Sequence, residues 1–355
     1  MGLENVNRKC GKYCDWHRMR IRFCTMQSRR RCVLFMTSQA FAVCVWRAGA
    51  VAAAGGALVA ASQAAPLRLV ARISNSSLQR SPDEYIGISG LCALADDVLL
   101  AACGFYGQRA LRLSSAQLSA RHPSALKHVY SVALDAASGT LLLAFVGKAA
   151  AASGTLAADV VWLVSLQCVA DEWREVQRVQ TECTFTRQWV GLSFAGDSRV
   201  LCGQCLDDRL YAFDESAERR LRPLGAVVLD DKLCTFACTR LDGDSLVAIA
   251  VAGRTCVSLK RLVGAGNALR LEPLARTALA GAQNVLFRGD QLLVATTSQS
   301  VMSFSVSGGG LRGPRELLGA GAGALVYCWC LAGDRLVVAD SNSWNLVLYE
   351  LAAPE

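Results

Sequence analysis

Residues 333–349 read Gly-Asp-Arg-Leu-Val-Val-Ala-Asp-Ser-Asn-Ser-Trp-Asn-Leu-Val-Leu-Tyr, which is a tight polar turn, an apolar strand, a second polar turn and another apolar strand. Five earlier segments share its first half, in which a Gly or Asp turn follows one apolar strand and precedes a short apolar run. The turn residues that mark the six copies are separated by 42, 58, 47, 46 and 44 residues; they are Asp97, Gly139, Asp197, Asp244, Asp290 and Asp334.

This period predicts a β-propeller, whose blades repeat about every 40–50 residues. Helical solenoids share the period, but the runs here are rich in β-branched residues, are bounded by Gly and Asp turns, and lack helical periodicity. The run after each turn, such as Leu336–Ala339, is apolar at every position, as expected where neighbouring blades cover both faces of a strand. We therefore expect an all-β fold of about six four-stranded blades over residues 67–355.

Each blade also needs a third and a fourth strand. Segments such as Arg209–Phe213 and Val301–Val306 fill the third position. The fourth position is filled by Leu221–Leu224, Leu271–Leu274 and Arg315–Leu318, and the first two of these contain a proline. Proline inside a strand is tolerated at a sheet edge, so we expect these segments to be the outermost strands.

The two ends of residues 67–355 complement each other. The chain stops soon after a third strand at Leu346–Leu351, while the segment Leu67–Arg72 has the pattern of a missing outer strand. We predict that the two pair and close the ring, which removes an open sheet edge. We expect the closed ring to be a monomer.

The segment Gly333–Tyr349 resembles an NHL-type repeat, because Val-Ala-Asp is followed by a polar turn and an apolar strand. The Asp is kept in this copy alone; Cys103 and Thr296 are among the residues at that position elsewhere. The sequence contains no Trp-Asp dipeptide, so the similarity to WD-repeat propellers is one of architecture. The resemblance implies a scaffold for protein or peptide partners, or in some cases an enzyme site at one mouth of the channel.

Residues 1–66 differ in composition from the rest. Residues 1–47 hold ten of the 37 basic side chains and two of the 29 acidic ones, so the remainder carries 27 of each sign and shows no nucleic-acid footprint. The apolar stretch 33–65 is interrupted by Arg47, and neither half reaches the ~18–20 apolar residues of a membrane span. A mitochondrial transit peptide, a signal peptide cleaved near Ala64 and an unstructured extension all fit residues 1–66.

Eleven of the sixteen cysteines fall within residues 67–355, most of them inside apolar runs. We interpret them as free thiols used as small core residues, in a reducing intracellular compartment that is cytoplasmic, or mitochondrial if a transit peptide precedes them. Cys202 and Cys205 form a Cys-x-x-Cys pair, and Cys234 with Cys238 would be the second pair of a zinc site. A turn and a strand follow Cys205, whereas a thioredoxin-type pair begins a helix, so we expect packing within a hairpin.

Other motifs also favour structural roles. The glycines of Gly308–Gly313 match a dinucleotide pattern, but they are expected in a loop between strands and outside a βαβ unit. His122 and His128 are the histidines of residues 67–355, and a nucleophile motif to accompany them is missing. Paired aspartates fall in predicted turns. We therefore name no catalytic, metal or cofactor-binding residue and expect no cofactor.

The favoured function is a non-enzymatic scaffold that binds a protein or peptide on one face of the ring, and the alternative is a propeller-type hydrolase or lactonase with its site at the channel mouth. Candidate partner-binding residues lie where first strands begin, at Tyr130, Trp189 and Tyr327. Lys148 is the fourth candidate, because the 58-residue spacing implies an insertion over Lys148–Ala158 that would project from one face.

Overall fold

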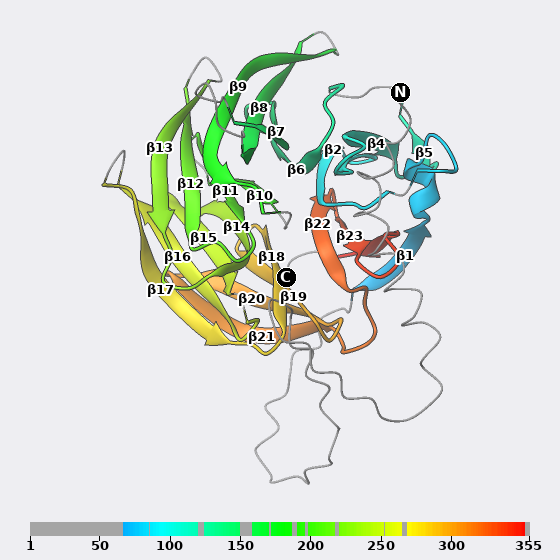
Figure 1. Ribbon diagram of the computed structural model, residues 1–355. Helices are drawn as coiled ribbons and strands as arrows, with labels where there is room; N and C mark the ends of the chain where they lie inside the picture. Colours follow the sequence, from blue (N-terminus) through cyan, green and yellow to red (C-terminus); the bar gives the residue numbers. More distant parts are fainter. Residues whose placement is uncertain are drawn as a thin grey trace, which may run out of the picture. The chain divides into compact units, whose positions relative to one another are not determined.

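The computed structural model describes residues 67–84, 86–119, 124–149, 158–169, 172–186, 190–195, 198–216, 220–251, 253–264 and 268–351. Within these ranges the chain forms six four-stranded antiparallel sheets and one short 3-10 helix, η1 (Asn75–Leu78) (Figure 1). The innermost strands of successive sheets contact one another in a closed cycle, with the last touching the first. The predicted six-bladed β-propeller is confirmed.

The first three blades run outward from the channel in chain order. Blade 1 contains β2 (Gly90–Ala95), β3 (Val98–Ala102), β4 (Gln108–Arg112) and β5 (Gln117–Leu118). Blade 2 contains β6 (Val129–Asp135), β7 (Thr140–Lys148), β8 (Asp159–Val169) and β9 (Glu172–Thr184). Blade 3 contains β10 (Val190–Phe194), β11 (Arg199–Gln204), β12 (Arg209–Glu215) and β13 (Leu221–Val228).

The last three blades follow the same order until the ring closes. Blade 4 contains β14 (Leu233–Leu241), β15 (Asp244–Val251), β16 (Cys256–Val263) and β17 (Arg270–Ala278). Blade 5 contains β18 (Ala282–Arg288), β19 (Gln291–Thr296), β20 (Val301–Ser307) and β21 (Gly310–Leu318). Blade 6 contains β22 (Val326–Ala332), β23 (Arg335–Asp340), β24 (Leu346–Glu350) and β1 (Arg68–Ile73).

The core is divided into six apolar clusters, one at each boundary between neighbouring blades. The second strand of a blade explains this division, because its successive side chains point to opposite faces. In β7, Leu141 and Leu143 pack against blade 1, while Leu142 and Ala144 pack against blade 3. All four are at most 1% exposed, which accounts for the uninterrupted apolar runs in the sequence.

The predicted closure of the ring is also confirmed. Strand β1 pairs antiparallel with β24, with Arg68 opposite Glu350 and Ile73 opposite Leu346. Leu67 extends the junction, since its backbone N–H donates to the carbonyl of Leu317 in blade 5 at 3.1 Å. A strand from the beginning of the described chain therefore completes the blade formed by its end.

The proline-containing segments occupy the outermost strands as expected, with Pro223 in β13 and Pro273 in β17. The expectation of a loop over Gly308–Gly313 is wrong for most of that segment. The turn between β20 and β21 is confined to Gly308 and Gly309, and β21 begins at Gly310. An outermost strand pairs on one side alone, so it can accommodate these glycines through shifts of register.

The predicted N-terminal extension, residues 1–66, lies outside the described residues, so its targeting or unstructured character stays a prediction. In the described part of the chain, no helix has the length and apolar character needed to cross a membrane.

A pair of substitutions in β1 tests the closure. Ile73 is 5% exposed in the core between blades 6 and 1, so Ile73→Ala is expected to lower the free energy of unfolding by about 2–5 kcal/mol. Leu69→Ala, at a 49% exposed position of the same strand, should change it by less than about 0.5 kcal/mol. Urea unfolding followed by tryptophan fluorescence measures both; small, equal effects would contradict the docking of β1.

Candidate binding face at the channel mouth

The two faces of the ring follow from the strand order. One face, here called the entry face, is where the innermost strands begin. Because the blades are antiparallel, the turns between second and third strands lie on this same face, and so do the ends of the outermost strands. The turns between first and second strands lie on the opposite face. Loops gathered on a rigid frame are the usual location of binding residues.

The entry face is marked by a bulge that recurs at the start of four innermost strands. In each case the pairing with the second strand skips one residue directly after the first pair. The skipped residues, all half-buried, are Tyr130, Cys234, Gln283 and Tyr327. A bulge of this kind redirects a side chain, and bulges are over-represented next to functional sites.

Two of these bulged residues are predicted partner-binding candidates, and each contacts another aromatic ring. The rings of Tyr327 and Trp344 meet edge to face with centroids 5.0 Å apart. Those of Tyr130 and Phe185 lie 4.8 Å apart. Sequence reasoning missed Trp344 and Phe185, which belong to the β23–β24 turn and the segment after β9. The structure thus places Tyr130 and Tyr327 on one face, each supported by an aromatic neighbour.

Tyr327 stays neutral across the physiological range. Burial raises the pKa of Tyr327 to about 12, and the nearby Cys328, Cys205 and Tyr130 groups act in the same direction. A neutral phenol both donates and accepts hydrogen bonds, and its ring offers a rigid apolar surface. The side chain therefore suits recognition of a partner better than acid–base chemistry at neutral pH.

The other two predicted partner-binding residues are Trp189 and Lys148. Trp189 lies outside the described residues. Lys148 ends β7 on the entry face and forms a 2.9 Å ion pair with Asp159, with both side chains largely exposed. An exposed pair of this kind contributes about 0–1 kcal/mol, so its charge remains accessible to a partner.

The predicted insertion of blade 2 begins at this ion pair. The backbone N–H of Ala149 donates to the carbonyl of Ala158 at 2.9 Å and closes the base of the connection, while residues 150–157 are outside the described residues. The extra length of the blade is shared with its strands, since β8 has 11 residues and β9 has 13. The 58-residue spacing therefore reflects longer strands as well as the loop that was predicted.

Exposed apolar side chains add to the entry face, and sequence reasoning did not single them out. Phe105 and Leu206 occupy turns between second and third strands, and Val228 ends β13; their exposed fractions are 57%, 39% and 68%. His128, considered above as a catalytic base, packs against the Phe105 ring at 5.1 Å. Lys127 lies over the same ring, 5.9 Å from its centroid. The contacts of His128 fit a structural role, and His122 is outside the described residues.

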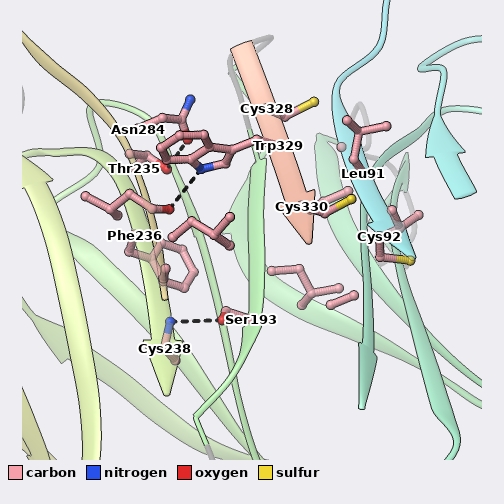
Figure 2. A pocket seen from close by; sticks show the side chains of 18 of the residues that line it. Leu91, Cys92, Ser193, Thr235, Phe236, Cys238, Asn284, Cys328, Trp329 and Cys330 are labelled. Atoms are coloured by element: carbon pink, nitrogen blue, oxygen red, sulfur yellow. Dashed lines mark hydrogen bonds between the residues drawn. The ribbon is translucent and has the colours of Figure 1, made fainter. Parts of the chain in front are cut away.

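The channel behind the mouth is lined by all six innermost strands and encloses about 300 Å³ (Figure 2). Every residue that lines it is neutral, and the polar ones are mainly Ser, Thr, Asn and Cys.

Their hydrogen bonds join neighbouring blades. The side chain of Asn284 donates to the carbonyl of Tyr327 at 2.8 Å and accepts from the hydroxyl of Thr235 at 3.3 Å. The indole N–H of Trp329 donates to the carbonyl of Val285 at 3.2 Å, as Figure 2 shows. These bonds hold the innermost strands of blades 4, 5 and 6 in register with one another.

The cysteines considered above as two metal-binding pairs are rearranged in the structure. Cys202 is buried in the core between blades 2 and 3, and Cys238 is half-buried on β14, where it lines the channel. Cys205, in contrast, lies opposite Cys234 across the boundary between blades 3 and 4, because backbone hydrogen bonds join the adjacent Leu206 and Leu233. Among the described residues, no group of three or more His, Cys, Asp or Glu side chains is arranged to hold a metal ion.

Fold and site together define a closed six-bladed β-propeller with an aromatic entry face. No protein-family model and no curated protein matches the chain. Its fold is similar to a chain in the crystal structure of a mitotic checkpoint complex (13% identity, 85% of this chain and 100% of that one, TM-score 0.48). It is also similar to the Cps50 (Swd1) β-propeller domain of Myceliophteria thermophila (10% identity, 81% and 100%, TM-score 0.49) and to U3-55K (12% identity, 81% and 100%, TM-score 0.43).

Removal of the Asn284 side chain tests the bonds that support the mouth. Asn284→Ala leaves the buried hydroxyl of Thr235 and the carbonyl of Tyr327 without this partner, and we expect a loss of about 1–3 kcal/mol in the free energy of unfolding. The neighbouring half-buried Gln283, changed to Ala, is the matched control and should cost less than about 1 kcal/mol. Chemical unfolding curves with equal midpoints for the two variants would contradict this account.

Proposed function

We propose that the propeller is a non-enzymatic scaffold that binds a protein or peptide on its entry face. The observation that carries the proposal is the recurring bulge, which brings residues from blades 2, 4, 5 and 6 to one mouth. Two of them, Tyr130 and Tyr327, are aromatic, and burial keeps Tyr327 neutral at physiological pH. Tyrosine and tryptophan are enriched at the energetic centres of protein interfaces.

The distribution of exposed apolar residues supports the same face. Six large hydrophobic side chains are exposed among the described residues, and Phe105, Leu206 and Val228 lie on the entry face. Leu69 and Val70 belong to the outermost strand β1, and Val169 ends β8 on the opposite face. Protein interfaces combine apolar and charged side chains, and this face offers both, with charges at Lys127 and Lys148.

The alternative, a hydrolase or lactonase, requires carboxylates or histidines converging at the channel mouth. The described lining of the channel presents hydroxyl, amide, thiol and apolar groups. Several of its polar side chains form hydrogen bonds between blades, which favours a rigid binding surface. We therefore retain the scaffold as the proposed function.

The proposal is tested by comparing matched substitutions on the two faces of the full-length chain. A partner is first identified by affinity purification and mass spectrometry, and its Kd is then measured with purified components. Phe105→Ala is expected to weaken binding at least tenfold, because an exposed aromatic residue at an interface commonly contributes more than about 1.4 kcal/mol. Val169→Ala, at a 43% exposed apolar position on the opposite face, should leave Kd within about twofold.

Tyr327→Ala extends the test to the mouth itself, with thermal unfolding used to confirm that the variant is folded. Two results would refute the entry face as the binding surface. One is that Val169→Ala weakens binding as much as Phe105→Ala does. The other is that the Phe105 and Tyr327 variants bind the partner with the same Kd as the original chain. Light scattering of the same samples tests the predicted monomer.

A further inference from the structure

The strongest unassigned feature is a pair of cysteines held together at the boundary between blades 3 and 4. The backbone N–H of Leu206 donates to the carbonyl of Leu233, and the N–H of Leu233 donates to the carbonyl of Asp207, each at 2.7 Å. This is the pattern of a β-bulge between antiparallel segments, with Leu206 at φ +67°. In that register Cys205 falls opposite Cys234.

The Cys234 sulfur has two neighbours that favour its thiolate. They are the Cys205 thiol opposite it and the guanidinium of Arg254 in the β15–β16 turn. When it is protonated, Cys234 can donate to the carbonyl of Gln283 at 3.5 Å. Opposing residues of antiparallel segments have Cα atoms about 4.5–5.5 Å apart, within the ~4.4–6.8 Å that a disulfide spans. A bond between the two sulfurs therefore requires little movement of the backbone.

A small oxidant can reach this pair. Both side chains are half-buried. Cys205 lines a surface hollow of about 500 Å³ together with Gln204, Asp207 and Tyr211.

The surroundings assign different protonation states to the two sulfurs. The Cys205 thiol opposite it lowers the pKa of Cys234 to about 7, with help from Arg254 and against the effect of burial. The interaction with Cys234, followed by burial, raises the pKa of Cys205 well above its ordinary value. Near pH 7 Cys234 is thus substantially a thiolate, while Cys205 keeps its proton. A reactive thiolate beside a second thiol is the arrangement found in redox-sensitive cysteine pairs.

We propose that Cys234 and Cys205 form a peroxide-sensitive thiol pair that closes to a disulfide across the boundary between blades 3 and 4. The Cys234 thiolate attacks hydrogen peroxide, the O–O bond breaks, and sulfenic acid and hydroxide form. The Cys205 sulfur then attacks the sulfenic sulfur, its proton leaves with the departing hydroxyl as water, and the S–S bond forms. Two thiols are oxidised by two electrons in total, and one peroxide is reduced.

Other cysteines of the ring provide internal comparisons. Burial raises the pKa of Cys92 and of Cys103 to about 12, so both stay protonated and enclosed. Cys168 is exposed near the end of β8, on the face opposite the pair. Cys168 is therefore the control for a thiol that is accessible but is not set opposite a second cysteine as Cys234 is. The inference concerns oxidation chemistry and is independent of the proposed partner-binding function.

Full-length protein is treated with increasing hydrogen peroxide, alkylated, digested without reduction and analysed by mass spectrometry. We expect a peptide linked through Cys205 and Cys234 to appear first, to lack two hydrogens relative to the separate peptides, and to disappear on treatment with dithiothreitol. Cys168 should remain available for alkylation at the same dose. Oxidation of Cys168 at an equal rate, or absence of the linked peptide, would overturn the proposal.

Two variants separate the roles of the sulfurs. Cys234→Ser should abolish the linked peptide and leave Cys205 unmodified, whereas Cys205→Ser should accumulate sulfenic acid at Cys234 that a dimedone probe captures. Arg254→Gln is expected to shift the pH profile of Cys234 alkylation upward and to slow alkylation at pH 7 by roughly threefold, as lower thiolate content predicts. An unchanged pH profile, in a variant whose thermal unfolding matches that of the original chain, would contradict the part assigned to Arg254.

Discussion

The pairing of β1 with β24 is the constraint on which the rest of the structure depends. A blade buries both faces of its second strand only when a neighbour covers each side, so an open row of blades would leave two apolar faces in water. Closure covers both, because Ile73 packs into the core between blades 6 and 1 while Leu67 packs between blades 5 and 6. It also fixes the first strands around one channel, and this brings residues distant in sequence to a common mouth.

The six first strands converge on the channel, and their crowding there accounts for the bulges. Near the channel the strands are close together, and the side chains that line it include small or hydrogen-bonded ones such as Ser131 and Asn284. A single skipped residue turns the next side chain from this crowded channel toward the entry face. Tyr130 and Tyr327 can be large because they occupy that skipped position. The same backbone irregularity thus allows a compact channel and an aromatic mouth.

The sequence contained enough information for the blade period, the closure and the outermost strands, because these depend on apolar runs and turn residues that repeat locally. It identified Tyr130 and Tyr327 as residues at strand entries. It could not identify Phe105 or Trp344, since their positions on the entry face depend on how turns from separate blades meet. The neighbour of Cys205 could not be identified for a related reason: the Cys-x-x-Cys spacing points to Cys202, which is buried between blades 2 and 3, whereas the blade boundary sets Cys205 opposite Cys234.

The position of that pair follows from a difference between blades 3 and 4. Strand β10 pairs with β11 without a register shift, and the pairing runs through Gln204 to the end of β11. The β11–β12 turn therefore starts at Cys205, level with the bulge of β14 that holds Cys234. Here the first strand of blade 4 begins with a bulge and the first strand of blade 3 does not. The turn between the second and third strands of blade 3 fills the space at the boundary. The facing positions of Cys205 and Cys234 are thus a consequence of how the blades differ, and they lie on the face that the aromatic residues also occupy.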